Sequence, residues 1–141
     1  MATLTVSIKE DLNLNGTEYG GEYVMSETVT QVYKRIINCT ATEQSVLLFA
    51  AADAAGTLKD ATVDYLRITN LDASADVQLR IVGASTQYYV KLEAGDSWML
   101  GNSLMYADAT GTSAAESTIA IDTIHADVSS GTADVEIFAA L

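Results

Sequence analysis

The sequence predicts an all-β fold, namely a single-domain antiparallel β-sandwich or jelly roll of about eight strands. Apolar and polar residues alternate with a period of two in most segments between turns, which indicates strands rather than helices. Turn-forming Gly, Asn and Asp residues recur between these segments. At 141 residues the chain is long enough for one domain with its own core.

The N-terminal stretch is expected to be a strand followed by a connector. Residues 3–8 (TLTVSI) alternate as a half-buried strand does, whereas residues 12–21 contain the turn pairs Asn-Gly and Gly-Gly. We therefore divide the chain into residues 1–28, a candidate interaction arm, and residues 29–141, the sandwich domain. A short strand with a Gly-rich connector can pair with another subunit's edge.

The next part of the chain predicts further strands. Residues 29–39 (VTQVYKRIINC) are rich in β-branched and aromatic side chains and predict one long strand. Residues 45–49 (SVLLF) predict a short buried strand, and the Ala-rich stretch 50–62 is expected to be a loop. Residues 87–100 predict a strand, an Ala-Gly-Asp turn and another strand.

Two segments share one plan, and each predicts a hairpin. VDYLRITNLDASADVQLRIVG (63–83) and IDTIHADVSSGTADVEIFAAL (121–141) match at a constant spacing of 58 positions, from Asp64 to Asp122 and from Val77 to Val135. The expected inward residues are Leu66, Ile68, Val77, Leu79, Ile81, Ile119, Ile121, Val135, Ile137 and Ala139. The repeat indicates either two equivalent binding sites or the matching halves of two packed sheets, and the second interpretation is favoured.

Charge disfavours several classes of partner. The net charge is -12, and no Lys or Arg follows Lys91. Such a chain repels phosphate backbones and anionic lipids, so we expect neither nucleic acid nor a membrane as partner. No apolar run is long enough for a membrane span, and residues 1–16 do not resemble a secretion signal, which favours synthesis in a cytoplasm.

The residues that usually carry chemistry are scarce, and we expect no catalytic, cofactor-binding or metal-binding residues and no enzymatic activity. His125 and Cys39 are the only residues of their types, and Cys39 ends a β-branched run typical of a buried, inert thiol. The Gly-containing segments 53–60 and 108–116 lack the ligand spacing of a calcium loop. The possibility of a glycosidase pair of carboxylates is left open, because spacing in the sequence does not give the separation of two carboxylates in space.

Aromatic residues are the candidate partner-binding positions. An exposed ring could stack on a sugar or anchor a protein interface, or it could lie at the surface of the core. Tyr88 and Tyr89 are adjacent, so they should lie on opposite faces of one strand. The candidates are Tyr19, Tyr23, Tyr88, Tyr89, Trp98 and Tyr106.

Residues 63–141 contain two elements that resemble small β-sandwich structural proteins from the virions of tailed bacteriophages. Those proteins often show an Asp-Tyr-x-x-Ile-x-Asn-x-Asp hairpin, a following Lys-Leu-Glu-Ala-Gly-Glu-like turn and a short apolar C-terminal strand. The first element is matched by Asp64, Tyr65, Ile68, Asn70 and Asp72. The second is matched by residues 91–96 (KLEAGD), with Asp96 in place of Glu.

The resemblance implies a non-enzymatic virion structural protein without a cofactor, and first of all a capsid decoration (cement) protein. Such a protein would be made in the host cytoplasm and would bind the capsid exterior. Its partners would be the major capsid protein or other virion subunits, and it would form a homo-oligomer, with a trimer favoured. The alternatives are a tail or neck component, or a β-sandwich module that binds carbohydrate or a cell surface.

Overall fold

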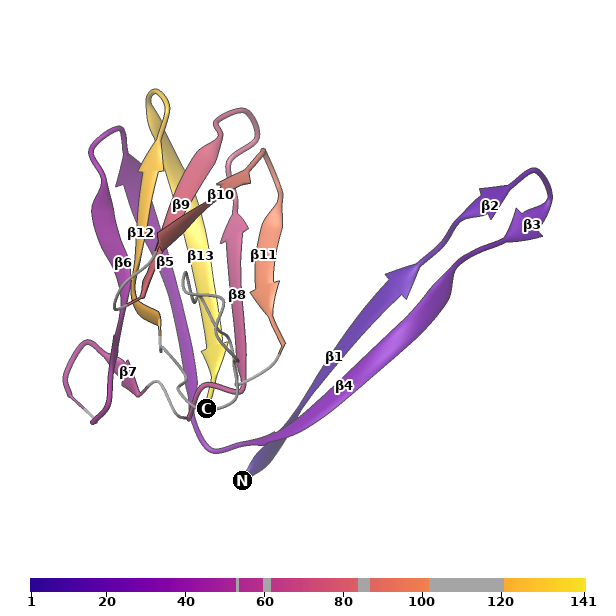
Figure 1. The fold of residues 1–141 in the computed structure, drawn as a ribbon, viewed down its shortest axis with the longest axis horizontal. Helices are drawn as coiled ribbons and strands as arrows, with labels where there is room; N and C mark the ends of the chain where they lie inside the picture. The colour runs from indigo at the N-terminus through magenta and orange to yellow at the C-terminus, as the bar shows by residue number, and fades with distance from the viewer. Residues whose placement is uncertain (53, 60–61, 84–86, 102–120) are drawn as a thin grey trace, which may run out of the picture.

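A computed structural model describes residues 1–52, 54–59, 62–83, 87–101 and 121–141, and it confirms the all-β prediction. Two β-sheets form a sandwich, and a long β-hairpin projects from one end of it (Figure 1). The described residues contain thirteen strands rather than about eight, partly because the arm contributes four and three strands have only two residues each.

The sandwich consists of a four-stranded and a five-stranded sheet. Their strand orders are β11-β8-β13-β5 and β10-β9-β12-β6-β7, and every pair is antiparallel except β6 with β7. The strand bounds are β5 (Val32–Thr40), β6 (Gln44–Ala50), β7 (Leu58–Lys59), β8 (Tyr65–Asn70), β9 (Val77–Gly83), β10 (Gln87–Leu92), β11 (Ser97–Leu100), β12 (Ile121–Val128) and β13 (Thr132–Ala140).

The prediction of two hairpins is wrong, because each repeated segment is an arch that crosses between the sheets. Strands β8 and β13 lie in the four-stranded sheet, whereas β9 and β12 lie in the five-stranded sheet. The apolar rows of β8 and β9 therefore face each other across the core instead of lying side by side. The six-residue connection between β8 and β9 is also longer than the two-residue turn of a tight hairpin.

The two arches interleave with two-fold pseudo-symmetry. In the four-stranded sheet Ile68 pairs with Ile137, and in the five-stranded sheet Ala126 pairs with Leu79. A shift of 58 positions, the spacing of the repeat, converts one pair into the other. The same shift converts Asn70–Val135 into Val128–Val77, and Leu66–Ala139 into Ile124–Ile81. The arches thus supply one strand each to the centre of both sheets.

The core lies between the sheets and contains the inward residues that alternation predicts. Leu66, Ile68, Leu79, Ile81 and Ile137 are fully buried, as are Val77, Val135 and Ala139. Ile121 is also buried, and Ile119 lies outside the described residues. Strand β6 departs from strict alternation: Val46 and Leu47 are both buried, because the register with β12 shifts beside them in a β-bulge.

Cys39 is fully buried at the end of β5, as expected for an inert thiol. Desolvation by burial raises the pKa of this thiol, and the Asp127 and Asp134 carboxylates raise it further. The hydrogen bond with Gln44 acts in the opposite direction. Because the thiolate is the reactive form, this environment disfavours nucleophilic chemistry at Cys39.

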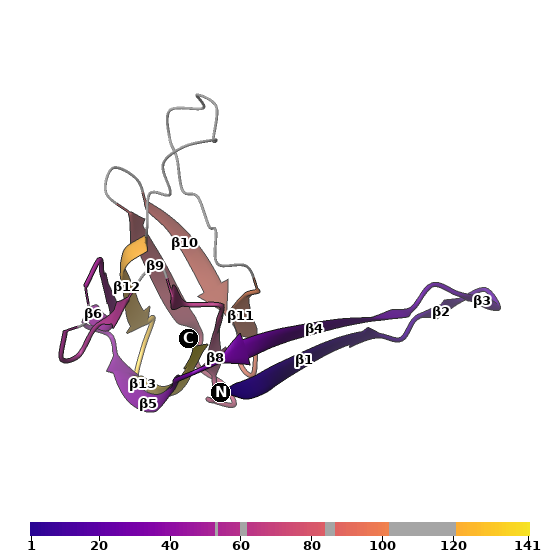
Figure 2. The same cartoon turned by 90° about the horizontal axis from the view of Figure 1, so that it is seen from below.

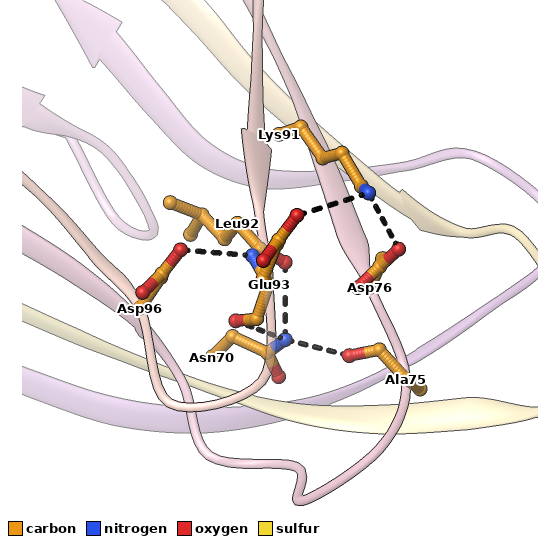
Figure 3. Close-up of polar contacts among 7 residues, drawn as sticks. All are labelled: Asn70, Ala75, Asp76, Lys91, Leu92, Glu93 and Asp96. Atoms are coloured by element: carbon orange, nitrogen blue, oxygen red, sulfur yellow. Dashed lines mark hydrogen bonds and ion pairs between the residues drawn. The ribbon is translucent and has the colours of Figure 1, made fainter.

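Asn70 is the buried polar residue of the described core, and it ties the first arch to the β10–β11 turn (Figure 3). Its Nδ2 group donates to the backbone oxygens of Ala75, Leu92 and Glu93 at 2.7, 3.2 and 3.0 Å. Its own backbone N–H donates to the Asp96 carbonyl at 2.9 Å. The two elements of the phage-protein resemblance are therefore joined by one side chain.

The acidic residues near this junction are turn formers. Oδ1 of Asp72 accepts hydrogen bonds from the backbone N–H groups of Ser74 and Ala75, both at 2.8 Å, which closes the arch connection. The Asp96 carboxylate accepts a bond from the backbone N–H of Glu93 at 3.2 Å (Figure 3). Lys91 Nζ lies 2.7 Å from the Asp76 carboxylate and 3.5 Å from that of Glu93.

The segment 29–39 is not one strand, because the chain breaks at Thr30 and Gln31. The backbone N–H groups of both residues donate to the Leu141 carbonyl, at 2.6 and 3.0 Å, and the Leu141 N–H donates to Gln31. These bonds divert the chain from β4 (Gly21–Val29) into β5. The arm and the sandwich therefore meet at a two-residue hinge that Leu141 clamps.

Replacing Asn70 with Ala should lower the free energy of unfolding by about 2–4 kcal/mol, because three backbone carbonyls lose their donor. Urea denaturation measures this loss. Asn38 is the matched control, since its side chain bonds Asp134 at 2.8 Å in an exposed position. Asn38→Ala should cost well under half as much as Asn70→Ala, and equal losses would contradict the structural role of Asn70.

Asp72 should make folding stability depend on acid. Its backbone hydrogen bonds, first that from Ala75, hold the pKa of its carboxyl below the usual value. Ionised Asp72 therefore adds stability above its unfolded pKa of about 4, and this contribution is lost as pH falls through the folded pKa. In thermal unfolding at pH 7, the native protein should have a higher Tm than the Asp72→Asn variant. The difference between the two Tm values should shrink as the pH is lowered. A gap that stays constant would refute this.

Candidate interaction surface

Residues 1–29 form an arm whose two faces differ in polarity. Strand β1 (Ala2–Glu10) pairs along its whole length with β4, antiparallel. One face contains Leu4, Val6 and Ile8 from β1 with Tyr23 and Met25 from β4, together with Ala2, Glu10, Gly21, Glu27 and Val29. The opposite face contains Thr3, Thr5, Ser7, Lys9, Glu22, Val24, Ser26 and Thr28. The arm therefore has an apolar face and a mostly polar face.

The base of the apolar face packs on the outer surface of the four-stranded sheet. Leu4, Val6 and Met25 are half-buried there against a cluster that includes Val29, Tyr65, Phe138 and Ala140. The Tyr65 and Phe138 rings meet edge to face, with their centroids 6.1 Å apart. This second, smaller core anchors the arm, since a two-stranded hairpin is marginally stable by itself.

The tip of the arm is a tight hairpin formed by β2 (Asn13–Leu14) and β3 (Thr17–Glu18). Asn15 and Gly16 both have positive φ angles, 53° and 82°, as a type I′ turn requires. At Gly20 a Cβ atom would lie 2.2 Å from the Glu10 backbone oxygen, so a residue with a side chain would not fit there. The stretch predicted as a connector therefore continues the hairpin to its tip.

The outer half of the arm projects away from the sandwich (Figures 1 and 2). There the apolar face is exposed: Ile8 is 42% and Tyr23 63% accessible, and Leu12, Leu14 and Tyr19 are also exposed. Residues 9–22 combine four carboxylates (Glu10, Asp11, Glu18 and Glu22) with Lys9 alone as a cation. A projecting apolar stripe with an acidic border is typical of a surface that binds a partner.

The structure does not gather the predicted aromatic residues at one site, although it brings Tyr88 and Trp98 together. Tyr19 and Tyr23 are exposed on the arm, and Tyr89 is exposed on the outer side of β10. Tyr88 and Trp98 pack against the main core and meet edge to face at 6.5 Å, and burial raises the pKa of Tyr88. Tyr106 lies outside the described residues. Of this set, the two arm tyrosines share an element with other exposed apolar residues.

His125 does not form a Ser-His-acid triad with its neighbours. Its Nδ1 atom lies 3.4 Å from Ser45 Oγ and 3.8 Å from the Glu43 carboxylate, so both groups face the same ring nitrogen. A triad needs the acid at one nitrogen and the serine at the other. Glu43 instead pairs with Arg80, whose hydrogen bonds hold the pKa of that carboxyl below its usual value.

The described part of the chain contains no group of three or more His, Cys, Asp or Glu residues arranged to hold a metal ion. Residues 108–116, and Asp53 and Asp60 of the other Gly-containing segment, lie outside it. Within that same part, no helix is long and apolar enough to cross a membrane.

Sequence analysis identified Tyr19 and Tyr23 but missed Ile8, Leu12 and Leu14 of the arm and Ile36 of β5, which are also exposed. A signal was present for Ile8, since it continues the alternation of Leu4 and Val6. Alternation shows which side chains share a face, but it does not show whether another layer covers that face.

Comparison with protein-family profiles, with curated proteins and with solved structures found no match for this chain.

Replacing Val6 with Asp should loosen the arm, because a carboxylate would have to be buried against the anchor cluster. Hydrogen–deuterium exchange should then rise across residues 2–29 and stay unchanged in β8 and β13. Ser7→Asp is the control, since Ser7 is exposed on the polar face. An equal rise in both variants would show that the apolar face does not anchor the arm.

Proposed function

We propose that this chain is a non-enzymatic structural protein of a bacteriophage virion, and specifically a capsid decoration protein. In this role it would bind the exterior of the head and bridge neighbouring subunits. A protein that binds only the assembled shell stabilises that shell by mass action, and many bound copies add avidity.

The observation that carries the proposal is the projecting arm. A hairpin that leaves its own domain and exposes Ile8, Tyr23 and the apolar tip residues has a surface left to bury. Such a surface suits assembly with other subunits better than it suits small-molecule chemistry, which needs convergent polar groups in a concave site.

The resemblance in residues 63–141 supports the same proposal. Its polar residues have structural duties here: Asn70 joins the first arch to the β10–β11 turn, and Asp72 and Asp96 close turns. The shared pattern is thus a means of building this kind of sandwich. The proposal of a phage protein rests on this resemblance. The proposal that the chain binds other virion subunits rests on the arm.

Co-sedimentation with heads of the phage that encodes the chain tests the proposal. The purified protein should pellet with heads, should not pellet with isolated tails, and should raise the temperature at which heads release DNA. Tyr23→Asp should weaken head binding at least about tenfold, because an exposed aromatic anchor is replaced by a charge.

Val24→Asp is the matched control, since Val24 is 51% exposed on the polar face of the same strand. It should bind heads as the native chain does. Pelleting with tails alone would place the protein in the tail or neck. Binding to glycans on an array, with no binding to either particle part, would instead identify a carbohydrate-binding module.

A further inference from the structure

The edge of the four-stranded sheet has the properties that the arm requires of a partner. Strand β5 is the outermost strand of that sheet, and on its free side no other described strand pairs with it. An unpaired nine-residue edge without proline is a template for association unless something covers it. Val32 and Ile36, on the outer face of β5, are 56% and 55% exposed.

The charge on β5 is opposite to that of the outer arm. Residues 30–40 contain Lys34 and Arg35 and no acidic residue, in a chain of net charge -12. Lys34 Nζ lies 3.0 Å from the Glu136 carboxylate, which Arg67 also contacts at 2.6 Å, so this outer face carries two cations around one anion. The outer arm, in contrast, has four carboxylates and one lysine.

The arm is held away from its own β5. Thr30 and Gln31 are the sole residues between β4 and β5, and their hydrogen bonds to Leu141 fix the direction in which β4 leaves the sandwich. The anchor cluster holds the base of the arm in the same direction. The exposed half of the arm therefore projects away from the sandwich, where it can contact a neighbouring molecule (Figure 2).

From these observations we infer that the arm of one copy binds along β5 of a second copy of this chain. Ile8, Tyr23 and the apolar tip cover Val32 and Ile36, and the arm carboxylates lie near Lys34, which shares that outer face. The inference rests on the proposed function in taking the arm as the assembly element, and it names this chain itself as the arm's partner.

The dimensions fit this arrangement. The free part of the arm, residues 7–16, and the nine-residue β5 each span about 30 Å at about 3.3 Å per residue. A two-stranded face about 10 Å wide, docked reciprocally between two copies, buries about 1,200 Å² counted over both partners, which reaches the size of specific interfaces. In a ring, the arm of each copy would instead bind β5 of the next copy. Each subunit would then form the same contact once with its arm.

Size-exclusion chromatography with light scattering on the full chain tests the inference. The native protein should have a mass that is a multiple of 14.9 kDa. Tyr23→Asp in the arm and Ile36→Asp on β5 should each shift it toward 14.9 kDa, weakening self-association at least about tenfold. Val24→Asp and Leu48→Asp are the controls, being exposed apolar residues outside the proposed contact.

Mixing the two disrupted variants distinguishes arm-to-β5 binding from contact between arms. The Tyr23→Asp chain keeps an intact β5 and the Ile36→Asp chain keeps an intact arm, so one of the two reciprocal contacts can form in the mixture. The mass of the mixture should therefore rise above that of either variant alone at the same total concentration. Circular dichroism should show that both variants remain folded, as expected for substitutions at exposed positions.

A monomeric native protein would overturn the inference, and so would a native mass retained in Ile36→Asp or a mixture that stays monomeric. The outcome is separate from the proposed function. A monomer that still binds heads would refute this inference alone, whereas an arm-dependent oligomer that ignores heads would refute the proposed function alone.

Discussion

The interleaving of the two arches is the constraint on which the rest of the sandwich depends. Each sheet has a central pair of strands, and each pair takes one strand from either arch. Neither sheet can therefore complete its centre before both arches are in place. Strands β5, β6, β10 and β11 flank the two central pairs, and β7 lies beyond β6. Such non-local pairing couples the formation of one sheet to that of the other.

The arm is stabilised quite differently from the sandwich. Its strands pair only with each other among the described residues, and its packing is confined to one small cluster at the base. The body contributes rigidity through a continuous core, whereas the arm contributes reach and an apolar surface. Among the described residues of the sandwich, Asn70, Asp72 and Asp96 bond the backbone at turns, and Arg80 pairs with Glu43.

The sequence was sufficient for the fold class and for most of the core, because period-two alternation shows which side of a strand is buried. It could not assign strands to sheets, since the inward faces of both sheets point at one core and give the same pattern in Leu66 and Leu79. Alternation in residues 3–8 predicts a half-buried strand, and Leu4 and Val6 do lie against a small core, but Ile8 continues the same alternation where nothing covers it. Exposure of Ile36 depends on whether another layer covers the outer face of β5, which no local pattern records.

Acidic turns lie together at one end of the sandwich. The β5–β6, β8–β9, β10–β11 and β12–β13 connections gather at the end opposite the hinge (Figure 1), and three of them contribute the carboxylates of Glu43, Asp72, Glu93 and Asp96. The arm starts from the hinge, at the other end of the sandwich (Figure 1). Copies arrayed side by side would then form a negatively charged outer layer, which repels other acidic particles and keeps such assemblies dispersed in solution.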